Sequence, residues 1–497
     1  YLLLPVCRCA GGESTSSLLH RRVYMYIDSL MKKCIKRCAV GLLVVAAAMV
    51  VVYRAVNRVP LPELPQNLQV YEIFSDGGCL SCHSADPKLP FYSKLPVMGD
   101  IVKADVDSGY RAFDMTKFME DVLNDSDDIN PVDLAKVEKV VLDDRMPMPK
   151  YYLVHWGSSL TAAKRAIVLD WVASVRAEMY ADGLAGDRAN EPVRPIDQKL
   201  EYDEAKAALG FALFHDTRLS VDNTVSCASC HALETAGVDN HQYSHGVNDL
   251  LGGVNAPTVF NAVYNFVQFW DGRAATLAAQ AAGPPLNPVE MASESFDQIV
   301  AKLKSDKKFV REFNAVYPDG LTEANITDAI EQFERTLVTP NSAFDKWLLG
   351  DDAALTAEEL EGYELFKKYD CATCHVGPNL GGLSYELMGL RRHYFAERGL
   401  ELTHEDNGRF KETQLERDRH RFKVPGLRNV EHTWPYYHDG TRETLEEAVS
   451  DMGLYQSGVE LTDAQTAKIT AFLKTLTGEY NGVPVTSNNS RDEIHGH

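Results

Sequence analysis

CASCH at residues 227–231 recurs in two variants, CLSCH at 79–83 and CATCH at 371–375. In the pattern CxxCH, two cysteines three positions apart can each form a thioether to one porphyrin, and the adjacent histidine can turn in as an axial iron ligand. Three such motifs predict three covalently bound haem c groups. The attachment residues are then Cys79, Cys82, Cys227, Cys230, Cys371 and Cys374, and the iron ligands are His83, His231 and His375.

A zinc or redox site is the alternative interpretation of a CxxCH motif. The other four cysteines, Cys7, Cys9, Cys34 and Cys38, all precede an apolar segment that ends at Tyr53. The chain beyond Tyr53 therefore has no further cysteine with which to complete a zinc site. It also has none to form a disulfide, so we expect core packing and covalent haem to stabilise it.

The residue in the sixth position of each iron decides between electron transfer and catalysis. Downstream of the first CxxCH, the segment Asp-Arg-Met-Pro-Met-Pro at 144–149 offers two thioethers. Methionine usually fills a core, but the prolines of this segment fix the loop, so that a thioether can face the iron. We predict Met146 as the ligand of the first haem, with Met148 as the alternative.

The chain repeats itself beyond about residue 200. A Gly-x-x-Leu-Phe segment precedes both CASCH and CATCH, at 210–214 and 362–366. Further along, a proline is followed 14 residues later by an Asp-Gly pair in both copies, from Pro257 to Asp271 and from Pro425 to Asp439. The shared spacing predicts two haem domains of common descent. The second copy carries about 24 additional residues between its CxxCH and this block.

The predicted fold is all-α, with three cytochrome c-like haem domains, the last two an internal duplication, behind one N-terminal transmembrane helix. Apolar residues recur at helical spacing in 161–179, 296–317 and 321–337, and no run alternates as a strand would. The expected units are 1–30, unassigned and interpreted as a misplaced start; 31–58, a basic stub and membrane anchor; 59–185, a mono-haem cytochrome domain; 195–345, a peroxidatic haem domain; 346–480, an electron-transfer haem domain; and 481–497, a polar tail.

The apolar run from Ala39 to Tyr53 follows four basic residues between Lys32 and Arg37. As a helix it would span about 22 Å, which is short for a bilayer. The basic residues predict that the N-terminus is cytoplasmic and that the rest of the chain lies outside. A cleaved signal peptide is the alternative. We favour an uncleaved anchor because Met49 to Tyr53 prolong the apolar run. Separately, Met31 would be a natural start of the protein, which is why residues 1–30 are interpreted as a misplaced start.

The chain has a formal net charge of -21, which argues against a nucleic-acid surface, because phosphates are bound by clustered Lys and Arg. Small substrates or basic protein partners fit this charge better.

Residues 200–478 resemble the bacterial di-haem cytochrome c peroxidases along nearly their whole length. Residues 79–176 look like a small haem-binding cytochrome domain, and with the anchor the chain is most similar to the tri-haem quinol peroxidases of that family. The motifs that carry the resemblance are Ser244-His245-Gly246, Asn255-Ala-Pro-Thr-Val259, Phe269-Trp-Asp-Gly-Arg273, Asn287-Pro-Val-Glu-Met291, Phe422-Lys-Val-Pro425 and Tyr437-His-Asp-Gly440.

The resemblance implies different tasks for the two repeated haems. The haem of His231 would be peroxidatic, with His245 as a sixth ligand that can be displaced. The haem of His375 would be the high-potential electron-transfer haem, with Met452 opposite the histidine; a thioether ligand raises the potential. His241 competes with His245 for the distal position, and Met388 competes with Met452.

The resemblance also implies a catalytic pocket. Glu290 and Gln280 match the distal pair of the family, in which a carboxylate takes a proton from one peroxide oxygen and delivers it to the other. Trp270 matches the tryptophan between the two haems. A further set of three residues matches the calcium site of the family. One side-chain amide and two backbone carbonyls are hard oxygen donors, which suit calcium. That set is Asn255, Thr433 and Pro435.

The implied function is reduction of hydrogen peroxide to two waters in the bacterial periplasm, by an enzyme anchored in the inner membrane. The electron donor stays open between membrane quinol and a c-type cytochrome, and a homodimer is compatible with the resemblance. One alternative is a multihaem electron-transfer protein without peroxidase activity. Another is a di-haem oxidase that modifies a protein partner, against which Met452 counts, since such a relative has tyrosine there.

Overall fold

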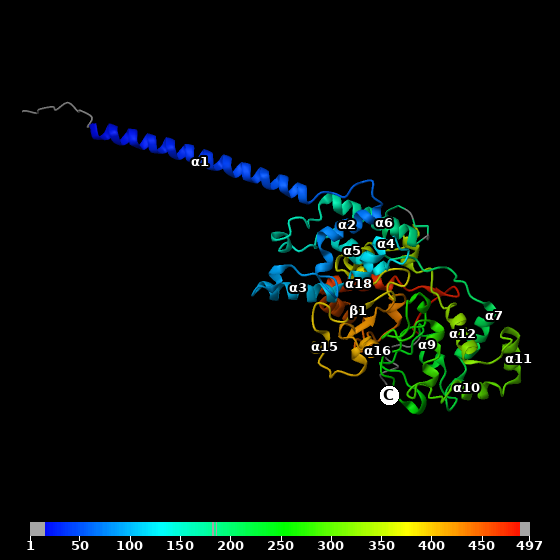
Figure 1. Cartoon of the computed structure of the whole chain (residues 1–497). Helices are drawn as coiled ribbons and strands as arrows, with labels where there is room; N and C mark the ends of the chain where they lie inside the picture. Colours follow the sequence, from blue (N-terminus) through cyan, green and yellow to red (C-terminus); the bar gives the residue numbers. More distant parts are fainter. Residues whose placement is uncertain (1–14, 181–182, 185, 488–497) are drawn as a thin grey trace, which may run out of the picture.

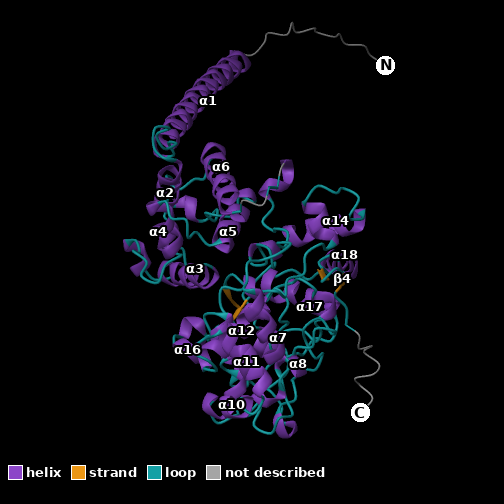
Figure 2. Ribbon diagram, turned by 90° about the vertical axis from the view of Figure 1, so that its right-hand side faces the viewer, coloured by secondary structure: helices purple, strands orange, loops and turns teal. Residues whose placement is uncertain are grey.

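The computed structural model describes residues 15–180, 183–184 and 186–487. Residues 1–14, residues 181, 182 and 185 of the expected unit 59–185, and residues 488–497 of the expected polar tail lie outside the described residues. The described chain is mostly helical, which confirms the coarse fold prediction (Figures 1 and 2). Strands are few, and we consider them below with the haem unit that contains them.

The first helix, α1 (Thr15–Val56), projects from the body as a single 42-residue rod (Figure 1). It passes through Met31 without interruption, so one helix joins the expected units 1–30 and 31–58. Its segment 20–56 contains a window of mean hydropathy 2.3 in which no residue is buried. By length and composition, this helix can cross a membrane.

The C-terminal end of α1 is attached to the rest of the protein through Asn57, which is buried. The Nδ2 atom of Asn57 donates to the carbonyl oxygen of Trp156 at 2.6 Å, and its Oδ1 accepts from the amide of Ser159 at 3.0 Å. These two bonds hold the end of α1 against the loop that precedes α6.

The first haem unit packs its helices around a core that includes Phe74, Phe118 and Trp171. Local sequence sets two of the helix starts. Asn130 accepts from the amide of Val132 and is followed by Pro131 at the first helical position, and Thr161 caps the helix predicted for 161–179. The helices are α2 (Gln66–Gly77), α3 (Met98–Ala112), α4 (Thr116–Asn124), α5 (Pro131–Leu142) and α6 (Ala162–Met179), with 3-10 turns at Cys79–Ser81, Phe91–Lys94 and Tyr151–Leu153.

The second haem unit is built on the crossing of α7 and α12. A Cβ at Gly210 would lie 1.9 Å from the carbonyl oxygen of Ala329, so only glycine permits this approach. Its helices are α7 (Glu204–Phe214), α8 (Cys227–Cys230), α9 (Leu277–Ala281), α10 (Phe296–Leu303), α11 (Lys307–Val316) and α12 (Glu323–Glu334).

In the third unit, a glycine likewise permits the close approach of α14 and α18. A Cβ at Gly362 would lie 2.0 Å from the carbonyl oxygen of Lys468. Gly210 and Gly362 are equivalent positions of the predicted repeat. The helices of this unit are α13 (Ala343–Leu348), α14 (Ala357–Lys368), α15 (Tyr394–Glu397), α16 (Phe410–Thr413), α17 (Leu445–Asp451), a π-helical turn (Met452–Ser457) and α18 (Asp463–Lys474).

The strands of the described chain form two small antiparallel pairs, which refine the all-α prediction. Strand β1 (Tyr385–Leu387) pairs with β2 (Arg421–Lys423), with Tyr385 opposite Lys423. Strand β3 (Glu479–Tyr480) pairs with β4 (Val483–Pro484) near the end of the described chain. The first pair closes the long insertion of the third unit, and it lines the site described next.

Candidate functional site

The histidines of the three CxxCH motifs share one local arrangement. In each, the ring Nδ1 lies within hydrogen-bonding distance of a backbone carbonyl, which can only accept, so Nδ1 carries the proton and Nε2 presents its lone pair. Burial lowers the pKa of all three rings, which keeps them neutral as metal ligands must be. The distances are 2.9 Å from His83 to Phe113, 3.3 Å from His231 to Gly237 and 2.8 Å from His375 to Leu380. This donor set fits haem iron.

One cavity of about 910 Å³ joins the first and third motifs. Met146 and Met148 both line it, as do Met388 and Met452, so each predicted thioether ligand and its competitor face the same space. The residues of the two motifs in its wall are Cys79, Cys82 and His83 from the first unit, and Cys371, Cys374 and His375 from the third. The sequence placed these motifs almost 300 positions apart, and only the fold brings them together.

Ion pairs hold the two units together beside this cavity. The Lys136 ammonium on α5 lies 2.6 Å from the Glu386 carboxylate on β1, and both side chains are largely buried. Arg145, next to Met146, lies 2.6 Å from Asp370, next to Cys371. Each contact therefore joins the neighbourhood of one haem motif to that of the other.

The predicted distal pocket of the second unit forms where two loops meet. The amide of Val247 donates to the carbonyl oxygen of Glu290 at 2.8 Å. A Cβ at Gly246 would lie 2.0 Å from the carbonyl oxygen of Val289, so glycine is required for this approach. The His245 loop consequently rests directly on the Asn-Pro-Val-Glu-Met string.

The Glu290 side chain is oriented by a neighbour from the same string. Asn287 Nδ2 donates to Glu290 Oε1 at 2.6 Å. Burial raises the pKa of Glu290, although Arg273 and the Asn287 amide act in the opposite direction. Gln280 lies on α9 and is partly exposed. No side-chain hydrogen bond joins Gln280 to Glu290 in the part of the chain that the structure describes.

His245 itself is close to the surface, with 47% of its side chain exposed. Its Nδ1 lies 2.5 Å from the carboxylate of Asp249, and its ring centroid lies 5.5 Å from that of His241. Asn248 and Asp249 both have positive φ angles, of 55° and 61°. The two histidines that compete for the distal position thus share one tight loop.

Trp270 and the predicted calcium ligands border the same large cavity as the first and third motifs. The Trp270 indole Nε1 donates to the carbonyl oxygen of Asn255 at 2.9 Å. Asn255 Nδ2 donates to the carbonyl oxygen of His241 at 2.9 Å, which leaves its Oδ1 available for a cation. Thr433 and Pro435 face the cavity with Asn255. All three residues therefore line one cavity, and the calcium site stays a prediction based on their oxygen donors.

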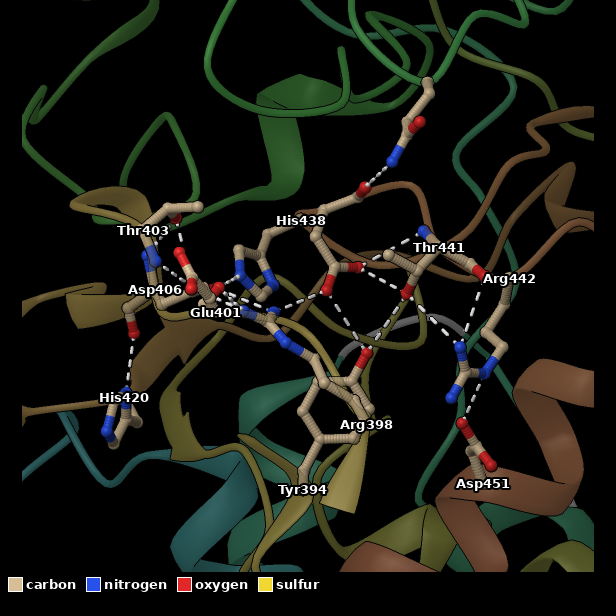
Figure 3. Close-up of polar contacts among 12 residues, drawn as sticks. Tyr394, Arg398, Glu401, Thr403, Asp406, His420, His438, Thr441, Arg442 and Asp451 are labelled. Carbon is tan, nitrogen blue, oxygen red and sulfur yellow. Dashed lines mark hydrogen bonds and ion pairs between the residues drawn. The ribbon is translucent and has the colours of Figure 1, made fainter. Parts of the chain in front are cut away.

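A buried charge network that sequence reasoning missed lies beside these residues (Figure 3). The Arg398 guanidinium lies 2.5 Å from Asp406 and 2.7 Å from Asp439, and His438 Nε2 lies 2.8 Å from Asp406. Despite the burial of Asp406, hydrogen bonds from His438 and Arg398 hold its pKa well below the usual range. The carboxylates and imidazole could be taken for a metal site, but Arg398 already forms an ion pair with both carboxylates, and His438 contacts Asp406.

This network fixes the long insertion of the third unit to the Tyr437-His-Asp-Gly string. Arg398 and Asp406 belong to the insertion, and Asp406 contacts the His438 side chain. The backbone oxygen of His438 in turn accepts from the amide of Asn255 at 2.8 Å. The insertion is therefore linked to the neighbourhood of Trp270. Its length was visible in the sequence, but its contact residues carried no recognisable motif.

Comparisons with known proteins show the family of the chain. A family described as di-haem cytochrome c peroxidase matches residues 204–353, and a family described as haem-binding domain matches residues 45–174. The cytochrome c peroxidase Ccp of Escherichia coli is 48% identical over 417 residues, which cover 84% of this chain and 89% of that protein. The cytochrome c551 peroxidase of Nitrosomonas europaea is 48% identical over 294 residues, covering 59% of this chain and 85% of that protein.

A solved structure of a MauG-like protein associated with microbial copper homeostasis has the same fold over 58% of this chain and 94% of its own, with a TM-score of 0.52 and 28% identity. The similarity to the Escherichia coli protein extends across both matched families, so it includes the N-terminal haem-binding unit. The chain belongs to the di-haem cytochrome c peroxidase family and is a haem peroxidase with an additional N-terminal haem-binding domain.

Proposed function

We propose that this peroxidase reduces hydrogen peroxide to two waters at the haem of His231, consuming two electrons and two protons. The observation that carries the proposal is the position of Glu290, a partly buried carboxyl whose loop supports the His245 loop directly. Cys227 and Cys230 would hold this haem and His231 would ligate its iron. When bound, the haem supplies an iron that can bind peroxide and accept electrons one at a time.

Glu290 performs the proton transfer in this proposal. Its carboxylate takes the proton from the peroxide oxygen nearer the iron and delivers it to the leaving oxygen, which departs as water. The amide of Asn287 keeps the carboxylate in one orientation through the 2.6 Å hydrogen bond. Gln280 orients the peroxide or a water molecule without exchanging a proton.

Electrons arrive through two further haems, for a total of three. The first is held by Cys79 and Cys82, with His83 and Met146 as ligands. The second is held by Cys371 and Cys374, with His375 and Met452 as ligands. The shared cavity of about 910 Å³ supports this order, because it places the two attachment sites next to each other. Trp270 then lies on the route toward the second unit.

His245 controls access to the peroxidatic iron in our proposal. It would coordinate the iron in the fully oxidised enzyme and would be released on reduction of the electron-transfer haem. Glycine at 246, 252 and 253 makes rearrangement of this loop easy. Calcium bound by Asn255, Thr433 and Pro435 would connect this loop to the third unit, because Asn255 is bonded to His241.

The donor we favour is membrane quinol, with α1 as an anchor that places the catalytic units in the periplasm. Steady-state peroxide reduction with a quinol analogue and with reduced cytochrome c tests this choice on the full-length protein. Pyridine haemochrome and intact mass should both give three haems. A count of two, or turnover only with cytochrome c, contradicts the electron path.

If the protein were a multihaem electron-transfer protein without peroxidase activity, it would reduce peroxide no faster than free haem does. The same assay separates it from the enzyme.

A further inference from the structure

A set of exposed apolar side chains lies in the segment 89–101 and at Trp156, whose backbone is bonded to the residue that follows α1. Its residues, which we call the interfacial patch, are Leu89, Phe91, Leu95, Val97, Ile101 and Trp156, all of them exposed. Phe91 is 81% exposed and Val97 is 70% exposed, values that are unusual for large apolar side chains. Soluble proteins rarely leave such groups clustered in water, because each exposed apolar area costs free energy.

Direct contacts connect the patch to the membrane helix. The Tyr92 hydroxyl lies 2.9 Å from Nε2 of His155, which joins the turn carrying Phe91 to the loop carrying Trp156. The carbonyl of Trp156 accepts from Asn57, the residue directly after α1. The patch therefore has a fixed position relative to the end of the apolar run. Figure 1 shows α3 extending from the body on the side from which α1 leaves.

We propose that the interfacial patch is a second membrane contact, which enters the headgroup region of the bilayer that α1 crosses. Tryptophan and phenylalanine are favoured at that depth, and the ring of Trp156 lies next to the point where the chain leaves the bilayer. The patch then holds the first haem unit against the lipid surface in one orientation.

This orientation brings the first haem motif close to the lipid. Leu80, between the two cysteines of the motif, is exposed. The Tyr151 ring stacks on His155 with centroids 3.8 Å apart, and its hydroxyl approaches Gly78 next to the motif. This inference rests on the proposed function and deepens it, because an electron donor dissolved in the bilayer would meet the first haem at this edge of the protein.

Spin-label depth measurements test the contact without any turnover. The full-length, haem-loaded protein would carry a nitroxide on Phe91→Cys, with Cys7, Cys9, Cys34 and Cys38 replaced by Ser, in nanodiscs of phosphatidylethanolamine and phosphatidylglycerol. We expect the label to collide frequently with oxygen and rarely with a water-soluble nickel chelate. The matched control is Phe211→Cys on α7, an exposed phenylalanine far from α1 in Figure 1.

Equal nickel accessibility at 91 and 211 overturns the contact, whatever donor the enzyme uses. Immobilisation of the label at 91 by added cytochrome c, in place of lipid protection, shows a protein-docking surface and also overturns it. Phe91→Asp with Val97→Asp should lower quinol-driven turnover several-fold while turnover with a soluble artificial donor is retained. If both turnovers fall together with haem content, the substitution has damaged the fold, and the spin-label result decides.

Lys423 offers a second, independent inference. It is 4% exposed and lines the large cavity together with His375 and Trp270. Its backbone amide donates to the Trp270 carbonyl at 2.8 Å. Among the described residues, no hydrogen bond or ion pair engages its ammonium group, whereas Lys136 in the same cavity is paired with Glu386. Burial lowers the pKa of Lys423 to about 8.

A buried ammonium without a counter-charge is costly, so an anion other than the side chains of the described residues would stabilise Lys423. Haem c carries two propionate carboxylates on the edge opposite its thioethers. The Lys136–Glu386 pair acts on Cys374, at the thioether edge. We infer that the Lys423 ammonium binds a propionate of the haem held by Cys371 and Cys374.

Potentiometric titration of the full-length, three-haem protein tests this pairing. Lys423→Met leaves the carboxylate uncompensated, which favours the oxidised iron. We expect the equilibrium constant for reducing one haem to fall at least tenfold, which corresponds to about 59 mV for a one-electron couple. Lys423→Arg keeps the charge and should keep the potential. Unchanged potentials in Lys423→Met, or an equal shift in Lys423→Arg, overturn the pairing.

Discussion

Nζ of Lys136 lies 2.6 Å from Oε1 of Glu386, across the boundary between the first and third haem units. Neither residue belongs to a recognisable motif, and they are 250 positions apart in the chain. Ser384 also donates to the same Glu386 oxygen at 3.2 Å. The pair is one of the contacts that fix the distance between the two haem attachment sites.

We expect Lys136→Met to weaken this boundary by about 3 kcal/mol, because the Glu386 carboxylate is left buried without its partner. Thermal unfolding and the rate of electron transfer from the first haem should both report the change. Arg145→Met, which removes a more exposed pair, should cost less than about 1 kcal/mol. The double variant Lys136→Met/Glu386→Gln should recover stability; a simple sum of the two single losses contradicts this account.

Glu290→Gln should keep its haems and their reduction but lose about 10² to 10⁴ in turnover, the usual contribution of general acid–base catalysis. The rate is measured on protein whose electron-transfer haem has already been reduced, so that activation is not limiting. Gln280→Ala should cost less, since Gln280 moves no proton. Wild-type turnover in Glu290→Gln would remove the catalytic role of this residue.

The pH profile of wild-type turnover should reflect the environment of Glu290. A base must be deprotonated, so activity falls as the pH drops through its pKa. Because burial raises this pKa above the ordinary value, the acid limb should lie at higher pH than for a solvated glutamate. Asn287→Ala removes a hydrogen bond that lowers the pKa and should move the limb further up. A limb that moves down contradicts the assignment.

His245→Gly should give a high-spin haem in the fully oxidised enzyme, because the displaceable ligand is gone. The hydrogen bond from Val247 to Glu290 still holds the loop in this variant, so the pocket keeps its shape. Absorption and electron paramagnetic resonance spectra report the spin state. His241→Gly is the matched control and should stay low-spin. A low-spin spectrum in His245→Gly would assign the distal ligand to His241.

Glu334 on α12 should make stability depend on pH. Burial raises its pKa from 4.5 to about 8, and its Oε2 has no hydrogen-bond partner among the described residues. Between these two pH values the folded carboxyl keeps a proton that the unfolded chain releases. The free energy of unfolding therefore falls as pH rises, by up to about 1.4 kcal/mol per pH unit.

Glu334→Gln should remove this slope and stabilise the second unit at pH 7 to 8, measured by chemical unfolding across the range. Glu323→Gln, an exposed position at the start of the same helix, should leave the slope in place. A wild-type slope in Glu334→Gln would mean that the carboxyl is already ionised in the folded protein.

The sequence by itself determined the features whose residues are neighbours in the chain. CxxCH specifies haem attachment through five consecutive positions, and the basic and apolar runs before residue 56 specify a long helix that can cross a membrane. Such signals survive without a fold, because the chain itself sets the spacing of the reacting groups. The catalytic role predicted for Glu290 came instead from the resemblance of the string 287–291 to the di-haem cytochrome c peroxidases.

Only the tertiary structure decided which distant segments meet. It joined the first and third haem motifs in one cavity, paired Lys136 with Glu386 and placed Arg398 beside Asp439. It also left Phe91 exposed, and it buried Lys423 without a carboxylate partner among the residues that the structure describes. The burial and the ion pairing of a side chain depend on every element packed around it. These properties therefore exist only in the folded chain, and no motif or periodic pattern in the sequence predicts them.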